Sequence, residues 1–196
     1  DYPMPHGGTA LRFDAVEFCV YDVFILARPG AEADHPTKRV EAARERLKTM
    51  SESDLARLER NLIEWVPARE FVYDRESFRR MLDTYRDISA DGLRENLAEF
   101  HREIMPVAEE EGVVMAIHPD DPPFPLFGLP RIVSTHDDLK ALLEAVPSRA
   151  NGLTFCTGSL GANPANDLPA MAKALGPHIH FAHLRNVKRE PCGSFH

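Results

Sequence analysis

Three residues that can ligate a divalent metal ion end three strands that the sequence predicts. They are His118 after the apolar run 113–117, Cys156 after the run 152–155, and His183 after the run 179–182. Imidazole and thiolate bind borderline ions such as zinc, iron or manganese, and parallel strands bring their carboxyl ends to one rim. The sequence therefore predicts a metal centre at such a rim. For His118 taken alone, a histidine that only makes hydrogen bonds at a strand end is the alternative.

The spacing of these three residues indicates how the strands are connected. Roughly 27 to 38 residues separate one from the next. A strand, a helix and their loops take up about that length, which is typical of a βα unit. A zinc finger would instead place its ligands about two to five residues apart. The spacing thus predicts a barrel or an open parallel sheet.

Helices predicted from apolar residues at steps of three and four occupy much of the remaining chain. The predicted helices cover 15–26, 37–50, 51–65, 74–88, 91–111, 137–146 and a segment from 166 or 167 to 175. Pro106 lies inside the helix 91–111 and predicts a kink there. Residues 1–9 and 157–163 contain the glycines or prolines typical of loops, and 71–73 is predicted as a short extended piece.

Composition restricts the class of protein. The chain has 196 residues, a net charge of −8 and 43% hydrophobic residues, as expected of a soluble globular protein with a sizeable core. The negative charge and the lack of a basic stripe argue against nucleic acid and anionic membranes as partners. No apolar run approaches the length of about 18 residues that spans a membrane, and no signal peptide is recognised. We therefore expect a cytoplasmic protein that acts on a small molecule.

Cysteine usage agrees with a reducing compartment. The three cysteines, Cys19, Cys156 and Cys192, are too few and too widely spaced for a disulfide framework. In a reducing compartment Cys156 would remain free to act as a thiolate ligand.

Longer motifs around the strand ends resemble the D-mannonate dehydratase family of hexuronate degradation. The most specific of them is the segment 115–131, MAIHPDDPPFPLFGLPR. Shorter matching segments are 10–14, 28–34, 93–96, 151–152, CTGS at 156–159 and FAHLR at 181–185. The resemblance therefore covers nearly the whole chain.

This resemblance implies a (β/α)8 barrel similar to xylose isomerases. Members of the family use Mn²⁺ or Fe²⁺ to convert D-mannonate to 2-keto-3-deoxy-D-gluconate and water. His118, Cys156 and His183 fall on the family's metal ligands, which are the three residues that the strand ends also indicate. The family's fourth ligand is an aspartate in a later Arg-Pro-Asp-His-Gly-His motif, whose neighbouring histidine takes part in proton transfer. This sequence does not contain that motif, so the catalytic acid and base are not assigned.

The implied fold class is α/β, a part of a TIM barrel that carries a helical insertion and is incomplete at both ends. A complete barrel needs eight strands and about 200 to 250 residues or more, whereas three strands are recognised here. We expect 1–35 to be a loop and helix leading from the barrel, and 36–90 to be the helical insertion. Residues 91–196 are expected to form consecutive βα units that carry the metal site.

Polar residues in the loops after the strands are candidates for substrate binding. Arg185, two residues after His183, could pair bidentately with a substrate carboxylate, with a purely structural arginine as the alternative. Asp120 and Asp121 could orient His118 or bind sugar hydroxyls, or they could cap a turn. Ser159 could bind a sugar hydroxyl or have a structural role.

Two other functions are compatible with these residues. A sugar isomerase or epimerase on the same barrel would favour carboxylate ligands, so the cysteine argues against it. A non-catalytic metal-binding protein would bind the ion without turnover. The expected partner is a small-molecule sugar acid, with no nucleic acid and no membrane, and the chain could form a homo-oligomer.

Overall fold

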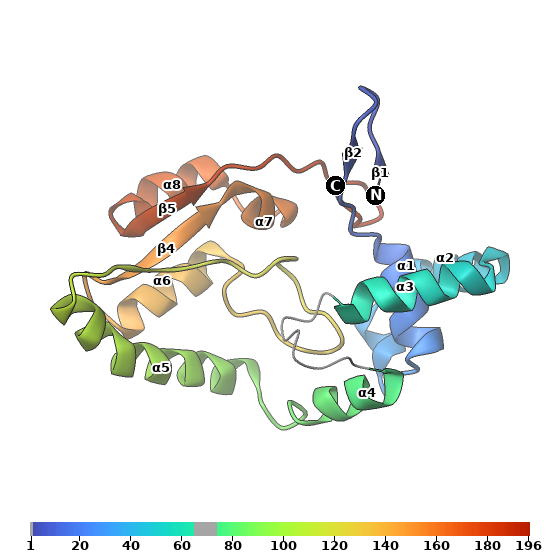
Figure 1. Ribbon diagram of the computed structural model, residues 1–196, viewed down its shortest axis with the longest axis horizontal. Helices are drawn as coiled ribbons and strands as arrows, with labels where there is room; N and C mark the ends of the chain where they lie inside the picture. Colours follow the sequence, from blue (N-terminus) through green and yellow to red (C-terminus); the bar gives the residue numbers. More distant parts are fainter. Residues whose placement is uncertain (1, 65–73) are drawn as a thin grey trace. The chain divides into compact units, whose positions relative to one another are not determined.

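The chain forms two compact units in the computed structural model, which describes residues 2–64 and 74–196 (Figure 1). Unit 1 comprises Asp1–Asp87, Phe127–Leu129 and Arg189–His196, and unit 2 comprises Ile88–Leu126 and Pro130–Lys188. Trp65, at the end of one predicted helix, and the extended piece predicted at 71–73 lie outside the described residues. Within the described part of the chain, no helix is long and apolar enough to cross a membrane.

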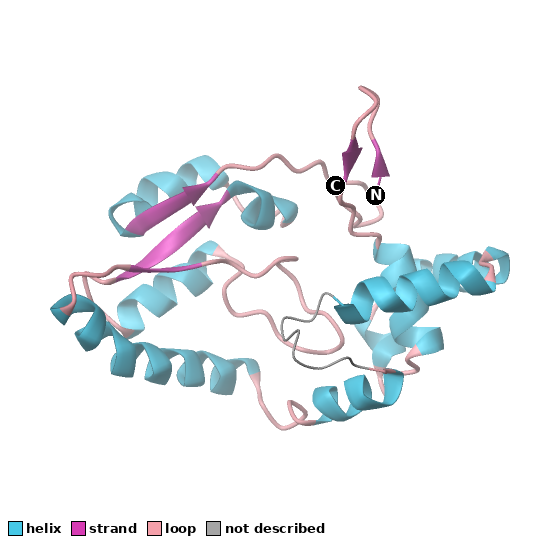
Figure 2. Cartoon of the chain, viewed as in Figure 1, coloured by secondary structure: helices cyan, strands magenta, loops and turns pink. Residues whose placement is uncertain are grey.

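Unit 2 contains a three-stranded parallel sheet in the order β3-β4-β5. Its strands are β3 Met115–Ile117, β4 Asn151–Cys156 and β5 Ile179–His183. The register pairs Ile117 with Leu153 and Cys156 with His183, after a bulge between Leu153 and Thr154. Every residue of β4 is buried, as expected of a central parallel strand. The parallel strands predicted to end at His118, Cys156 and His183 are therefore confirmed, and the fold is mixed α/β (Figure 2).

Unit 2 contains four helices in addition to the sheet. They are α5 Ala90–Glu110, α6 His136–Ala145, α7 Thr157–Ala162 and α8 Leu168–Leu175, followed by the 3-10 turn Gly176–His178. Thr135 and Asp138 form a capping box at the start of α6. Leu139 of α6, Met171 of α8 and Phe155 of β4 belong to one buried core, which fixes these helices on the sheet. Helix α5 runs through Pro106 as one helix.

The prediction of a loop at 157–163 is wrong for Thr157–Ala162, which form α7, and Asn163 follows as its C-cap. The Sγ of Cys156 caps this helix by accepting a hydrogen bond from the backbone N–H of Ser159 at 3.4 Å. A Cβ at Gly158 would overlap the guanidinium of Arg185, and one at Gly161 would come within 3.0 Å of Val187. The glycines are therefore required by close packing at this helix and not by a flexible loop.

Unit 1 is mainly helical. Its elements are the hairpin β1 Tyr2–Pro3 and β2 Thr9–Ala10, α1 Ala15–Cys19, the π-helical segment Val20–Ile25, the 3-10 turn Ala31–Asp34, α2 Thr37–Thr49, α3 Glu52–Glu64 and α4 Arg75–Asp83. Residues 4–8 form the loop and turn predicted within 1–9, whereas Tyr2–Pro3 and Thr9–Ala10 pair antiparallel as β1 and β2. The helix predicted to reach residue 88 ends at Asp83, because the N–H groups of Thr84, Tyr85 and Arg86 bond to carbonyls three residues back.

A buried carboxylate organises the start of unit 1. Asp22, in the π-helical segment, is 1% exposed and accepts hydrogen bonds from Arg28 Nε and Nη2, both at 2.8 Å. His35 Nε2 lies 3.0 Å from its second oxygen. Burial raises the pKa of Asp22, but the hydrogen bonds from Arg28 and His35 outweigh it and leave the pKa below its ordinary value.

Candidate metal centre

Three strand ends bring the predicted ligands together. Cys156 and His183 are the last residues of β4 and β5 and face each other in the register, and His118 directly follows β3. One ligand atom from each residue lies within 4.8 Å of the other two. His183 Nδ1 is 3.6 Å from Cys156 Sγ and 3.5 Å from His118 Nε2. The side chain of Cys156 is buried, whereas solvent reaches both histidines.

The chemistry of this donor set fits a divalent ion. His118 Nδ1 is 2.7 Å from the carbonyl oxygen of Pro119, which can only accept, so Nδ1 carries the proton and Nε2 presents a lone pair to the other two residues. Two atoms bound to one tetrahedral ion at typical lengths of 2.0 to 2.3 Å lie about 3.5 Å apart. His183 Nδ1 lies at about that separation from both other atoms, and all three ligand atoms lie within 4.8 Å of one another. These three residues could therefore hold a divalent metal ion.

Arg185 reaches across the strand ends toward Cys156. Its Nη2 donates to Asp121 Oδ2 at 2.6 Å and to Ser159 Oγ at 2.8 Å. Its backbone N–H donates to Thr157 Oγ1 at 2.8 Å, and the Thr157 hydroxyl in turn donates to the carbonyl of Arg185 at 2.6 Å. Partial burial lowers the pKa of Arg185, but the contact with Asp121 outweighs it and the pKa is raised. The guanidinium is therefore cationic and held in place.

Asp120 braces the loop that follows β3. Its Oδ2 accepts from the backbone N–H of Ile132 at 3.0 Å, from that of Val133 at 2.8 Å and from the hydroxyl of Ser134 at 3.1 Å. Because these bonds occupy that oxygen, they favour the turn-capping alternative for Asp120.

Ser159 does not lie where a substrate could reach it from solvent. It is fully buried, and its hydroxyl lies 3.3 Å from Cys156 Sγ as well as against Arg185. These contacts favour the structural alternative for Ser159.

Thr157 and Gly158 were not predicted as site residues, although both lie in the CTGS motif. Thr157 ties Arg185 to α7 by two hydrogen bonds, and Gly158 leaves the space that the guanidinium fills. A cysteine followed by serine three residues later, where a strand ends, is the spacing of a helix N-cap and could have indicated this arrangement.

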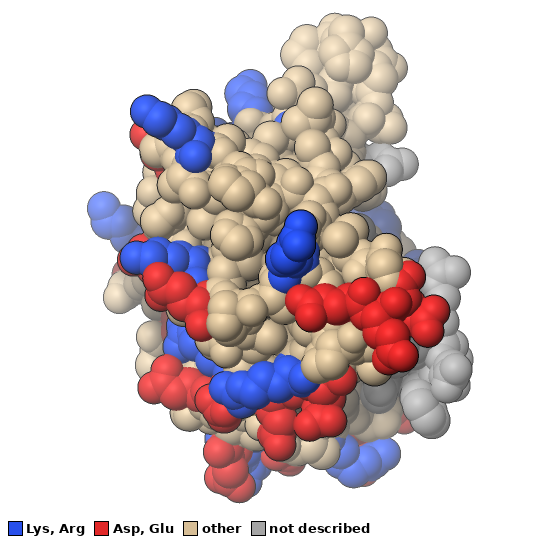
Figure 3. Space-filling view, turned by 90° about the vertical axis from the view of Figure 1, so that its left-hand side faces the viewer, with Lys and Arg blue, Asp and Glu red and all other residues tan. Residues whose placement is uncertain are grey.

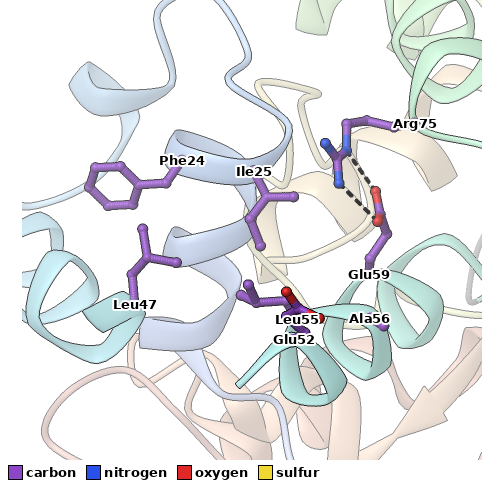
Figure 4. Close-up of a pocket in the computed structure, with 8 residues that line it drawn as sticks. All are labelled: Phe24, Ile25, Leu47, Glu52, Leu55, Ala56, Glu59 and Arg75. Atoms are coloured by element: carbon purple, nitrogen blue, oxygen red, sulfur yellow. Dashed lines mark hydrogen bonds and ion pairs between the residues drawn. The ribbon is translucent and has the colours of Figure 1, made fainter. Parts of the chain in front are cut away.

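A separate pocket in unit 1 contains none of the predicted site residues (Figure 4). It has a volume of about 480 Å³ and is lined by Phe24, Ile25, Leu47, Glu52, Leu55, Ala56, Glu59 and Arg75. Arg75 and Glu59 face each other at its edge and pair through two hydrogen bonds of 2.8 and 3.0 Å. Its cation and one of its two carboxylates therefore neutralise each other.

The molecular surface carries both signs of charge. Figure 3 shows a face on which Lys and Arg side chains lie among Asp and Glu side chains, next to a broad area with neither. On this face the basic residues do not gather into a stripe of their own.

Parallel strands whose ends bring histidine, cysteine and histidine together define an α/β protein with a candidate divalent-metal centre. The chain belongs to the D-mannonate dehydratase (UxuA) family, whose model matches residues 1–196. It is 50% identical over 195 residues to the mannonate dehydratase of Saccharophagus degradans, covering 100% of this chain and 49% of that protein. It is also 50% identical over 189 residues to the enzyme of Chromohalobacter salexigens, covering 96% of this chain and 48% of that protein.

A solved structure is also similar. The crystal structure of mannonate dehydratase from Streptococcus suis serotype 2 matches with a TM-score of 0.55 and 43% identity, over 58% of this chain and 33% of that one. The chain thus spans about half the length of the curated relatives that it matches.

Proposed function

We propose that this protein dehydrates D-mannonate to 2-keto-3-deoxy-D-gluconate and water with Mn²⁺ or Fe²⁺ held by His118, Cys156 and His183. The observation that carries the proposal is the convergence of these three ligand atoms within 4.8 Å, in a chain that the family model matches from end to end. When bound, the ion supplies Lewis-acid stabilisation of the negative charge that develops on the substrate.

Arg185 is the residue of this chain that we propose for the substrate carboxylate. Both of its contacts with Asp121 and Ser159 use Nη2, so we assign the remaining guanidinium nitrogens to the substrate. A guanidinium fixed by two partners loses little conformational freedom when it binds an anion, which favours tight and oriented binding. Orientation matters here, because dehydration removes a weakly acidic proton next to the carboxylate and protonates the departing hydroxyl. We propose that Asp120 holds the loop after β3 and that Ser159 holds Cys156 and Arg185 in place.

We also propose that β3, β4 and β5 are consecutive strands of a (β/α)8 barrel. Their parallel order, and the helices α6, α7 and α8 that connect them, support this fold. On this proposal 91–196 form βα units, 36–90 form a helical insertion and 1–35 lead from the barrel. A cytoplasmic location and a homo-oligomer complete the proposal.

The ligand set argues against the isomerase alternative. The cluster contains a thiolate donor and two imidazoles, with no carboxylate among the three. A harder, carboxylate-rich set would be expected of an enzyme that holds its ion as aldose–ketose isomerases do.

Turnover tests the proposal directly. Purified protein is incubated with Mn²⁺ and D-mannonate, and formation of a 2-keto acid is followed by derivatisation with semicarbazide. We expect product with the wild type and at most background with His183→Ala, while Cys192→Ala, which changes an exposed cysteine of unit 1, retains activity. Turnover of D-mannonate by His183→Ala at the wild-type rate would refute the assignment of the site.

A further inference from the structure

The sulfur of Cys156 has a dedicated hydrogen-bonding partner. Ser159 lies on the first turn of α7 and is 0% exposed. Its backbone N–H and its hydroxyl both point at Cys156 Sγ, at 3.4 and 3.3 Å. A buried sulfur that accepts two hydrogen bonds from one residue is fixed in direction as well as in place.

The direction of the hydroxyl proton follows from its other neighbour. A serine hydroxyl has one proton to donate, and a guanidinium has no atom that can accept it. Arg185 Nη2 donates to Ser159 Oγ at 2.8 Å, so the proton of Ser159 is left to Cys156. Asp121 accepts from the same Nη2 at 2.6 Å and holds the guanidinium in that position. The result is a row of hydrogen-bonded side chains that runs from Asp121 through Arg185 and Ser159 to Cys156.

Neighbouring backbone features support this row. Gly158 leaves the space that the Arg185 side chain fills over the first turn of α7. The Thr157 hydroxyl accepts from the backbone N–H of Arg185 and donates to the backbone carbonyl of Arg185. The row therefore links the chain that leaves β3, the helix that follows β4 and the chain that leaves β5.

We infer that Ser159, oriented by Arg185, is a positioning residue that directs the Cys156 sulfur toward the metal and adjusts the strength of its bond. The inference rests on the proposed metal site. Partners that hydrogen-bond to a metal ligand commonly change metal affinity by about 10- to 100-fold when they are removed. We expect the row to hold the sulfur at its observed separation from His183 and to withdraw electron density from it.

Cobalt replaces the native ion as a spectroscopic probe of this inference. The metal-free protein is titrated with Co²⁺, and the thiolate-to-cobalt charge-transfer band and the dissociation constant are recorded for wild type, Ser159→Ala and Ser134→Ala. Ser134 is a matched control, because it is 4% exposed and its hydroxyl donates to Asp120 in the same unit. Thermal unfolding of each metal-free variant measures any general loss of stability.

In Ser159→Ala we expect the charge-transfer band to move to longer wavelength, because the sulfur regains electron density. We expect Co²⁺ to bind about 10- to 100-fold more weakly, because the sulfur is no longer held toward the metal. Ser134→Ala should keep the wild-type band position. A wild-type band position and affinity in Ser159→Ala would overturn the inference while leaving the metal site intact. The lack of any thiolate band in the wild-type protein would overturn the proposed site itself, and with it this inference.

Discussion

Replacing Asp22 with alanine should lower the free energy of unfolding of unit 1 by about 3–5 kcal/mol, the usual cost of removing one partner from a buried ion pair. Asp22 is 1% exposed and its carboxylate binds both Arg28 and His35. Its removal leaves a guanidinium that is only 14% exposed without its bidentate partner. Because many domains are stable by only about 5–15 kcal/mol, the loss should be easy to observe.

Arg28 has one further partner that limits the cost. Asp34 accepts from its Nη2 at 2.6 Å, but the Asp34 side chain is 49% exposed. Solvent weakens such a pair to about 0–1 kcal/mol, so Asp34 cannot replace the buried interaction. The expected loss therefore remains within the range for a buried pair.

Urea denaturation followed by circular dichroism measures the change. The matched control is Glu45→Ala, which removes a pair with Lys48 at 2.7 Å whose side chains are 70% and 63% exposed. We expect a change of at most about 0.5 kcal/mol in the control. Equal effects of Asp22→Ala and Glu45→Ala would refute the reasoning that burial decides the contribution of these charges.

Two further predictions concern charge and packing. The hydrogen bonds from Arg12 lower the pKa of Glu190 from 4.5 to about 2, so its contribution to stability is complete above about pH 4.5 and is lost as the pH falls toward 2. The urea midpoint of Glu190→Gln should therefore fall less steeply over that range than that of the wild type, and parallel curves would contradict the prediction. Gly158→Ala should destabilise unit 2 by about 1–3 kcal/mol, because the clash with Arg185 exceeds the gain in helix propensity of at most about 1 kcal/mol. A melting temperature of Gly158→Ala equal to or above that of the wild type would contradict this prediction.

The sequence was most informative where local pattern and chemistry coincide. Short apolar runs that end at His118, Cys156 and His183 predict strands of the right spacing for βα units, and parallel pairing then determines that their ends meet. The start of α6 was equally predictable, because its capping box involves residues close in sequence.

What the sequence did not predict depends on contacts between distant residues. Helix α7 was taken for a loop because its glycines are required by Arg185 and Val187, both more than 25 positions away. Asp120 and Asp121 have different partners because of the path of their loop. The loop brings Asp120 to the backbone of Val133 and Asp121 to the guanidinium of Arg185. Composition and periodicity cannot predict which of two neighbouring aspartates makes which contact.

Equilibrium dialysis against Mn²⁺, followed by elemental analysis, tests most directly whether three strand ends hold one ion. We predict about one Mn²⁺ per chain in the wild type and in Cys192→Ala, and almost none in Cys156→Ala at the same free Mn²⁺ concentration. Thermal unfolding of metal-free Cys156→Ala checks that the variant is folded. Full retention of Mn²⁺ by folded Cys156→Ala would contradict the proposed centre.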